Sequence, residues 1–250
     1  MNFFFSIIIF LLTWIISALF AVAGVGAANT LIPIYYSLGI PFSIAAAAGL
    51  LLNVFSLSSA TTNNAKRQRV LWKLGTIFLI PAVAMAPLGA YIGIHTPRKI
   101  LLWIFVAFLA YTLYNLIRGK AKEESNKFAG VKGYSLGVIV GAIAGFLGGL
   151  LGVGGGMIIL PVLALIETDY KKVSATAGYI ALFSSASGFT SYLFLLRGIS
   201  YVLWIIISIG GILGGFTGSY LMNKMKTVYV KDTIIIIIAF VMLKVLVSLI

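Results

Sequence analysis

Residues 141–161 decide the fold, and they read GAIAGFLGGLLGVGGGMIILP. Four glycines stand within five positions: Gly152, Gly154, Gly155 and Gly156. Glycine weakens a helix and a helix end leaves amides unpaired, so we expect a break here. The apolar piece that follows, Met157–Ile166, would cover about 15 Å, which is half the hydrocarbon core of a bilayer. The stretch predicts a broken or re-entrant membrane helix, buried in protein or lining a cavity.

A second copy of this element lies near the start of the chain. Residues 24–33, GVGAANTLIP, align with residues 152–161, GVGGGMIILP, at an offset of 128. The similarity continues at offsets of 129 to 132, for example where Val70-Leu71-Trp72 matches Val202-Leu203-Trp204. The sequence therefore predicts a duplicated fold, with a first membrane repeat (1–117), a basic linker (118–132) and a second repeat (133–250).

The composition requires a membrane as solvent. Of 250 residues, 61% are hydrophobic and only 9% are charged, and the mean hydropathy is +1.12. Soluble domains carry about 25% charged residues, so a soluble enzyme and a disordered protein are both excluded. We expect an all-α, multi-pass protein of the cell membrane, with about four transmembrane helices and one short broken helix in each half. The expected elements are Phe3–Ala23, Thr30–Leu38, Phe42–Ser59, Leu74–Ile94, Ile100–Ile117, Tyr134–Leu151, Met157–Ile166, Val173–Leu196, Tyr201–Met222 and Thr233–Ile250.

Charged residues are few, and most of them are basic. Lys and Arg number 18 against five Asp and Glu, and the bases cluster between apolar runs. This pattern indicates topology signals and lipid contacts rather than nucleic-acid binding. With no cysteine and one histidine, the chain offers no disulfide and no evident metal site, and we expect no cofactor and no enzymatic activity. The expected partners are a small anion and the bilayer; a homodimer is left open.

Two orientations of the halves are compatible with the apolar pattern. If the short pieces do not cross, the halves are parallel, and about ten bases lie inside against seven outside. If each broken unit crosses and returns, the halves are inverted, and 14 bases lie inside with only Arg98, Lys99 and Arg197 outside. The positive-inside rule favours inverted halves and places the linker 118–132 in the cytoplasm.

The run from Gly141 to Pro161 resembles the glycine-rich signature of the sulfite exporter TauE/SafE family, small permeases for anionic sulfur compounds. The length and the copy at Gly24–Pro33 also fit, although the first copy has Ala27-Ala28-Asn29 where the second has glycines and Met157. The resemblance covers essentially the whole chain. It implies secondary transport of sulfite, sulfonates or related organic anions.

The broken elements also offer an anion site by their own chemistry. A helix that starts at Met157 would point the partial positive charge of its N-terminus into the protein. A second such N-terminus would start at Thr30, so backbone N–H groups from both halves would face one pocket at the midplane. The alternative is a break that is only structural. The candidate residues of the two breaks are Gly24, Gly26, Asn29, Thr30, Gly152, Gly154, Gly155 and Gly156.

Polar side chains near the breaks complete the candidate site. Asn53, Ser184 and Ser187 lie inside apolar helices and suit an oxyanion; the alternative is hydrogen bonding between helices. Glu167 and Asp169 are weaker candidates for proton or cation coupling, against a simple loop ion pair. We expect Lys244, near the end of the last helix, to snorkel to the interface.

Taken together, the residues predict a secondary transporter that holds a small sulfur-containing or organic anion between two glycine-rich half-helix N-termini. Two alternatives stay open at this point, an anion channel of the same fold and a membrane assembly protein that does not transport. Glycines at every fourth position in 137–149 and 210–218 are expected to serve close helix packing.

Overall fold

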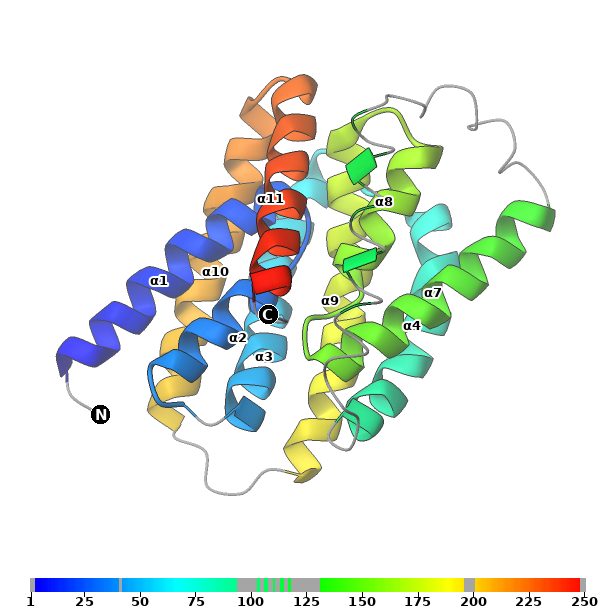
Figure 1. The fold of residues 1–250 in the computed structure, drawn as a ribbon. Coiled ribbons are helices and arrows are strands. Elements are labelled where there is room, and N and C mark those ends of the chain that lie inside the picture. Colours follow the sequence, from blue (N-terminus) through cyan, green and yellow to red (C-terminus); the bar gives the residue numbers. More distant parts are fainter. Residues whose placement is uncertain are drawn as a thin grey trace.

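The computed structural model describes residues 3–40, 42–93, 131–195 and 201–247, together with single positions between 103 and 117. Helices make up the regular structure of these residues (Figure 1). Their bounds are α1 Phe3–Val22, α2 Ala28–Ser37, α3 Phe42–Lys66, α4 Trp72–Gly93, α7 Val131–Leu151, α8 Gly156–Ile166, α9 Tyr170–Leu195, α10 Tyr201–Lys224 and α11 Thr227–Val247. The expected helix Ile100–Ile117 and the linker 118–132 lie largely outside the described residues.

Five of the described helices are long and apolar enough to cross a membrane, which confirms a multi-pass membrane protein. They are α1, α3, α4, α7 and α10. Of the remaining long helices, α9 is rich in serine and threonine, and α11 carries Lys231, Asp232 and Lys244 among its 21 residues. The short helices α2 and α8, with 10 and 11 residues, occupy the two predicted breaks.

Both breaks are built by the same backbone turn. Gly24 and Gly152 have φ angles of +68° and +71°, a left-handed conformation that glycine adopts without steric cost. The next amide in each case, of Val25 and Val153, donates back five residues to the carbonyls of Phe20 and Gly148. This hydrogen-bond pattern is the Schellman motif that ends helices, and it ends α1 and α7 at equivalent positions.

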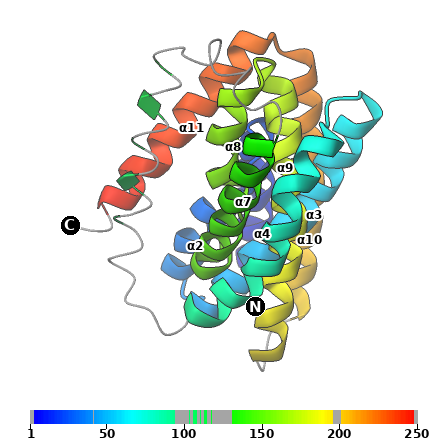
Figure 2. The ribbon, with the colours of Figure 1, turned by 90° about the vertical axis from the view of Figure 1, so that its right-hand side faces the viewer.

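The two halves interlock rather than pack as separate bodies. Helix α1 of the first half packs along α10 of the second, and α4 packs along α7, as Figures 1 and 2 show. Helices α3 and α9 cross in the interior and contact helices of both halves. Because each half lends a helix to the other, the interior forms only when both halves are present.

Glycines on the facing sides of these helices allow the helix backbones to approach closely. A Cβ atom at Gly141, Gly145 or Gly149 of α7 would overlap the α4 backbone at Phe78, Ala82 and Ala86 respectively. Glycines of α10 lie against α1 in the same way, with Gly214 beside Trp14 and Ser17 and Gly218 beside Ala18. The packing interpretation of the glycine spacing is therefore confirmed.

Polar contacts connect loops of both halves at one end of the bundle. Arg69, between α3 and α4, forms an ion pair with Asp169, between α8 and α9, at 3.1 Å. The Lys171 ammonium, at the start of α9, donates to the carbonyl of Asn223 at the end of α10. Bases cluster in these segments, and we call this side of the molecule the basic end. Parallel halves would place these loops on opposite sides, so these contacts favour the inverted arrangement.

The directions of the helices show how the chain runs through each broken unit. The glycine contacts show α1 running in the direction of α10, toward the basic end, and α7 running in the direction of α4, away from it. Helix α2 then returns to the opposite end and α8 returns to the basic end (Figure 1). Each unit thus enters from one end, breaks inside the bundle and goes back.

Candidate functional site

The N-termini of α2 and α8 face each other inside the bundle. Asn29 and Met157, each the second residue of its helix, are in contact: the Asn29 Nδ2 donates to the Met157 Sδ at 3.0 Å. The two positions are 128 residues apart, which is the offset of the repeat. Equivalent residues that touch each other lie on the axis relating the halves. The first turns of the two short helices are therefore in contact.

Asn53, in the middle of α3, forms hydrogen bonds to both broken units. Its Oδ1 accepts from the Ala28 amide at the start of α2, at 3.3 Å. Its Nδ2 donates to the carbonyl of Val153 in the other break at 2.9 Å and to the Ser185 hydroxyl at 3.3 Å. The side chain is fully buried, and both of its N–H groups are donated to protein acceptors. In this conformation Asn53 positions the two N-termini.

The candidate serines of α9 contact different parts of the bundle. Ser184 accepts the amide hydrogen of Gly155, the N-cap of α8, at 3.2 Å, so it lies at the break. Ser187 instead donates to the Val83 carbonyl of α4 at 2.7 Å. Ser185 faces Asn53 although it is not among the chosen candidates; its signal in the sequence is its offset of 132 from Asn53.

The remaining glycines of the breaks lie so close to neighbouring atoms that a side chain would not fit. A Cβ at Gly26 would overlap the Asn53 side chain, and one at Gly24 would overlap the Ser174 backbone. Gly154 has a φ of +74°, and a Cβ there would overlap the Ser185 hydroxyl. Gly156 begins α8 against Ala181 of α9. Side chains at these positions would push the half-helices out of the bundle centre.

Several polar groups at the meeting point retain hydrogen-bonding capacity. The amides at the second position of each helix, Asn29 and Met157, have no acceptor within their own helix. Thr30 is only 5% exposed, and its hydroxyl has no partner in the described part of the chain. Asn29 is only partly buried, unlike its neighbours on either side, so this point is reachable from outside the protein. The arrangement offers donors to an oxyanion.

Lys244 is a residue whose position the sequence did not indicate. Its ammonium does not snorkel away from the bundle as expected; it donates to the Thr30 carbonyl in the first turn of α2 at 2.9 Å. A basic side chain therefore stands beside one of the two N-termini. The distance of 214 residues along the chain gives no local signal of this contact.

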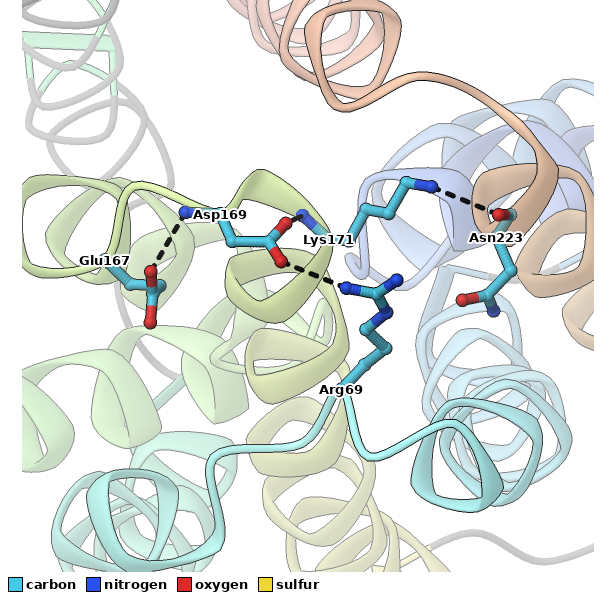
Figure 3. Close-up of polar contacts among 5 residues, drawn as sticks. All are labelled: Arg69, Glu167, Asp169, Lys171 and Asn223. Atoms are coloured by element: carbon cyan, nitrogen blue, oxygen red, sulfur yellow. Dashed lines mark hydrogen bonds and ion pairs between the residues drawn. The ribbon is translucent and has the colours of Figure 1, made fainter.

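Glu167 and Asp169 lie at the basic end, away from the half-helix N-termini. Figure 3 shows them with Arg69, Lys171 and Asn223. The Asp169 carboxylate accepts the Lys171 amide at 3.0 Å and so caps α9, and it also pairs with Arg69. Glu167 accepts the Asp169 amide at 2.9 Å. These contacts join the two halves at the basic end; a coupling role for the two carboxylates stays a prediction.

Within the described residues, no group of three or more His, Asp or Glu side chains could hold a metal ion. The donor set at the meeting point consists of amides, hydroxyls and one ammonium. Backbone N–H groups, hydroxyls and an ammonium can all donate hydrogen bonds to an anion.

The chain is similar to known membrane transporter proteins. The sequence model of the family described as sulfite exporter TauE/SafE matches residues 9–245. The chain is 26% identical over 201 residues to the protein named probable membrane transporter protein YunE of Bacillus subtilis (strain 168), which covers 74% of this chain and 73% of that one. It is 29% identical over 194 residues to the probable membrane transporter protein MJ0441 of Methanocaldococcus jannaschii, with 75% and 71% covered.

A plant protein is also similar over a shorter stretch. The chain is 31% identical over 119 residues to the sulfite exporter TauE/SafE family protein 1 of Arabidopsis thaliana, covering 45% of this chain and 26% of that protein. No solved structure matches this chain.

Proposed function

Because the chain belongs to the sulfite exporter TauE/SafE family of membrane transporters, we propose that it is a secondary transporter for a small sulfur-containing or organic anion. The observation that carries this proposal is the contact between Asn29 and Met157, each the second residue of its short helix.

The electrostatics of this contact favour an anion. Each helix N-terminus carries the equivalent of roughly half a positive charge. Two such ends that face each other in a medium of low dielectric constant repel each other, and a negative ligand between them removes the repulsion. Sulfite and sulfonates present several oxygens that accept from backbone N–H groups. The proposal therefore places the anion at the amides near Asn29 and Met157, with Ser184 and Thr30 beside them.

The interlocked halves support transport rather than simple binding. The two broken units enter from opposite ends, so the site lies between structures that open to opposite sides when one half rocks against the other. Asn53 holds both units in register through its contacts with Ala28 and Val153. A proton or cation transported together with the anion is part of the proposal, with no residue assigned to it beyond Glu167 and Asp169.

The test is a thermal-shift screen of the purified protein in detergent. The panel contains sulfite, thiosulfate, sulfate, taurine, isethionate, sulfoacetate and acetate, with matched chloride controls. A ligand at 100 times its Kd stabilises the folded state by about 2.7 kcal/mol, which is readily detected. Anions that stabilise the protein are then assayed by counterflow in proteoliposomes.

We expect selective stabilisation by one or a few sulfur anions, and saturable counterflow of the same anions. Flux that does not saturate and shows no counterflow would instead identify a channel. A protein that no panel anion stabilises and that transports none of them would contradict the proposal.

A further inference from the structure

Lys244 is a part-buried cation on α11, close to the proposed anion site. Its ammonium has three N–H groups, and the acceptor described for it is the Thr30 carbonyl at 2.9 Å. This carbonyl belongs to the first turn of α2, two residues from the start of the helix. An intramembrane charge is costly, and such residues are usually paired with an opposite charge or with a ligand.

No carboxylate in the described part of the chain pairs with this ammonium. The ion pair found among the described residues joins Arg69 to Asp169 at the basic end. Asp232 is on α11 itself but stands 12 residues earlier, which is about 18 Å along a helix. The positive charge beside α2 therefore adds to that of the helix N-terminus instead of being cancelled.

A second group at this point also lacks a partner. The hydroxyl of Thr30 is buried, with no hydrogen-bond partner in the part of the protein described, and it belongs to the residue whose carbonyl binds Lys244. Leaving a buried hydroxyl unpaired costs roughly 1–3 kcal/mol. A cation and a buried donor on the same turn, both with unused N–H or O–H groups, match the oxygens of one anion.

We propose that Lys244 is the counter-charge of the transported anion, and that it binds an anionic oxygen together with the Thr30 hydroxyl at the N-terminus of α2. This inference rests on the proposed function and makes its site asymmetric. Positions 112–116, which correspond to Lys244 at the offsets of the repeat, read Thr-Leu-Tyr-Asn-Leu and carry no charge. The negative group of the substrate consequently lies nearer to α2 than to α8.

The experiment compares four proteins: the wild type, Lys244→Met, Lys244→Arg and Lys231→Met. The last variant removes a positive charge from the same helix at the basic end, where Lys231 lies over the Tyr170 ring. Apparent Kd values come from thermal-shift titrations with each anion of the panel above, and counterflow is measured in proteoliposomes. Size-exclusion profiles and ligand-free melting temperatures verify that each variant is folded.

Loss of a hydrogen bond to a charged group raises Kd by roughly 10- to 150-fold, and we expect this rise for Lys244→Met. Lys244→Arg keeps the charge and should stay within a few-fold of the wild type, and Lys231→Met should bind normally. If the wild type binds an anion and Lys244→Met binds it equally well, the role of Lys244 is refuted while the transporter proposal stands. If the wild type binds and transports no panel anion, both proposals fail.

A second variant tests the same site in case Lys244→Met does not fold. Thr30→Val has nearly the same shape and removes only the unpaired hydroxyl, so it should fold at least as well as the wild type. We expect its Kd for the same anion to rise roughly tenfold. An unchanged Kd would remove Thr30 from the site.

Discussion

Asn53 is a buried structural link in the interior of the bundle. One amide group connects the start of α2, the second break and α9, and each of these contacts crosses between segments far apart in sequence. A hydrophobic residue of the same size would leave the Ala28 amide and the Val153 carbonyl without partners. The residue therefore contributes to stability as well as to the shape of the site.

Asn53→Ala should lower the free energy of unfolding by about 2–3 kcal/mol, because two buried backbone groups lose their partner. The matched control is Asn63→Ala on the same helix, where the amide donates to the Ser219 hydroxyl near the basic end. It should cost about 1 kcal/mol or less. Denaturant titrations in mixed micelles measure both values, and equal losses would contradict a central role for Asn53.

Neighbouring glycines of the second break should differ sharply in their tolerance of alanine. Gly154→Ala places a side chain at a φ of +74° and against the Ser185 hydroxyl, which should cost about 2 kcal/mol or more. Gly155→Ala has a φ of −74°, and its Cβ would lie 3.1 Å from the Ala144 carbonyl oxygen, so we expect less than about 1 kcal/mol. Melting temperatures of the two variants should differ by several degrees; equal values would show that the break is not conformationally demanding.

At the scale of elements, stability depends on backbone contact between helices of different halves. On α7, Gly145 lies against the backbone of Ala82 on α4, while a Cβ at Gly137 would meet side chains, those of Ile77 at 2.8 Å and Phe78 at 3.5 Å. In lipid, where helices gain little from burying apolar surface, such close contact is a main source of association.

Gly145→Ala should therefore separate α4 from α7 and destabilise the protein by about 2 kcal/mol or more. Gly137→Ala is the control on the same helix. The contact is with side-chain atoms, which can shift slightly, and alanine favours the helix by about 1 kcal/mol, so the loss should be much smaller than for Gly145→Ala. Yields of folded protein and melting temperatures compare the two, and a well-folded Gly145→Ala with an unchanged melting temperature would contradict the packing role.

For the whole molecule, the inverted arrangement predicts which loops share a side of the membrane. Gln68, Lys172 and Lys226 belong to segments at the basic end, whereas the exposed Tyr201, the first residue of α10, lies at the other end. Most of the bases in the described part of the chain lie at the basic end, which should face the cytoplasm.

The chain has no cysteine, so single cysteines can be introduced at these four positions without background. A membrane-impermeant maleimide added to intact cells should label Tyr201→Cys and leave Gln68→Cys, Lys172→Cys and Lys226→Cys unlabelled until the cells are opened. Labelling of Gln68→Cys on the opposite side of the membrane from Lys172→Cys would show that the halves are parallel.

Much of this fold could be predicted from the sequence because the bilayer imposes strong rules. Apolar runs of about 20 residues predicted most helices to within a few residues, and the repeat at offset 128 predicted the two breaks. Differences occur at polar helix ends: α3 continues to Lys66 rather than Ser59, and α11 begins at Thr227 rather than Thr233. Polar residues there still form regular backbone hydrogen bonds, which hydropathy does not register.

The sequence by itself determined the solvent, the duplication, the break at each glycine cluster and the charge bias that favours inverted halves, because these follow from local composition and from matches along the chain. Only the tertiary structure decided which groups meet. Asn29 touches Met157, Asn53 spans both breaks, and Lys244 reaches Thr30 across 214 positions. Such contacts depend on how the interlocked helices pack in three dimensions, and no local pattern of residues encodes that packing.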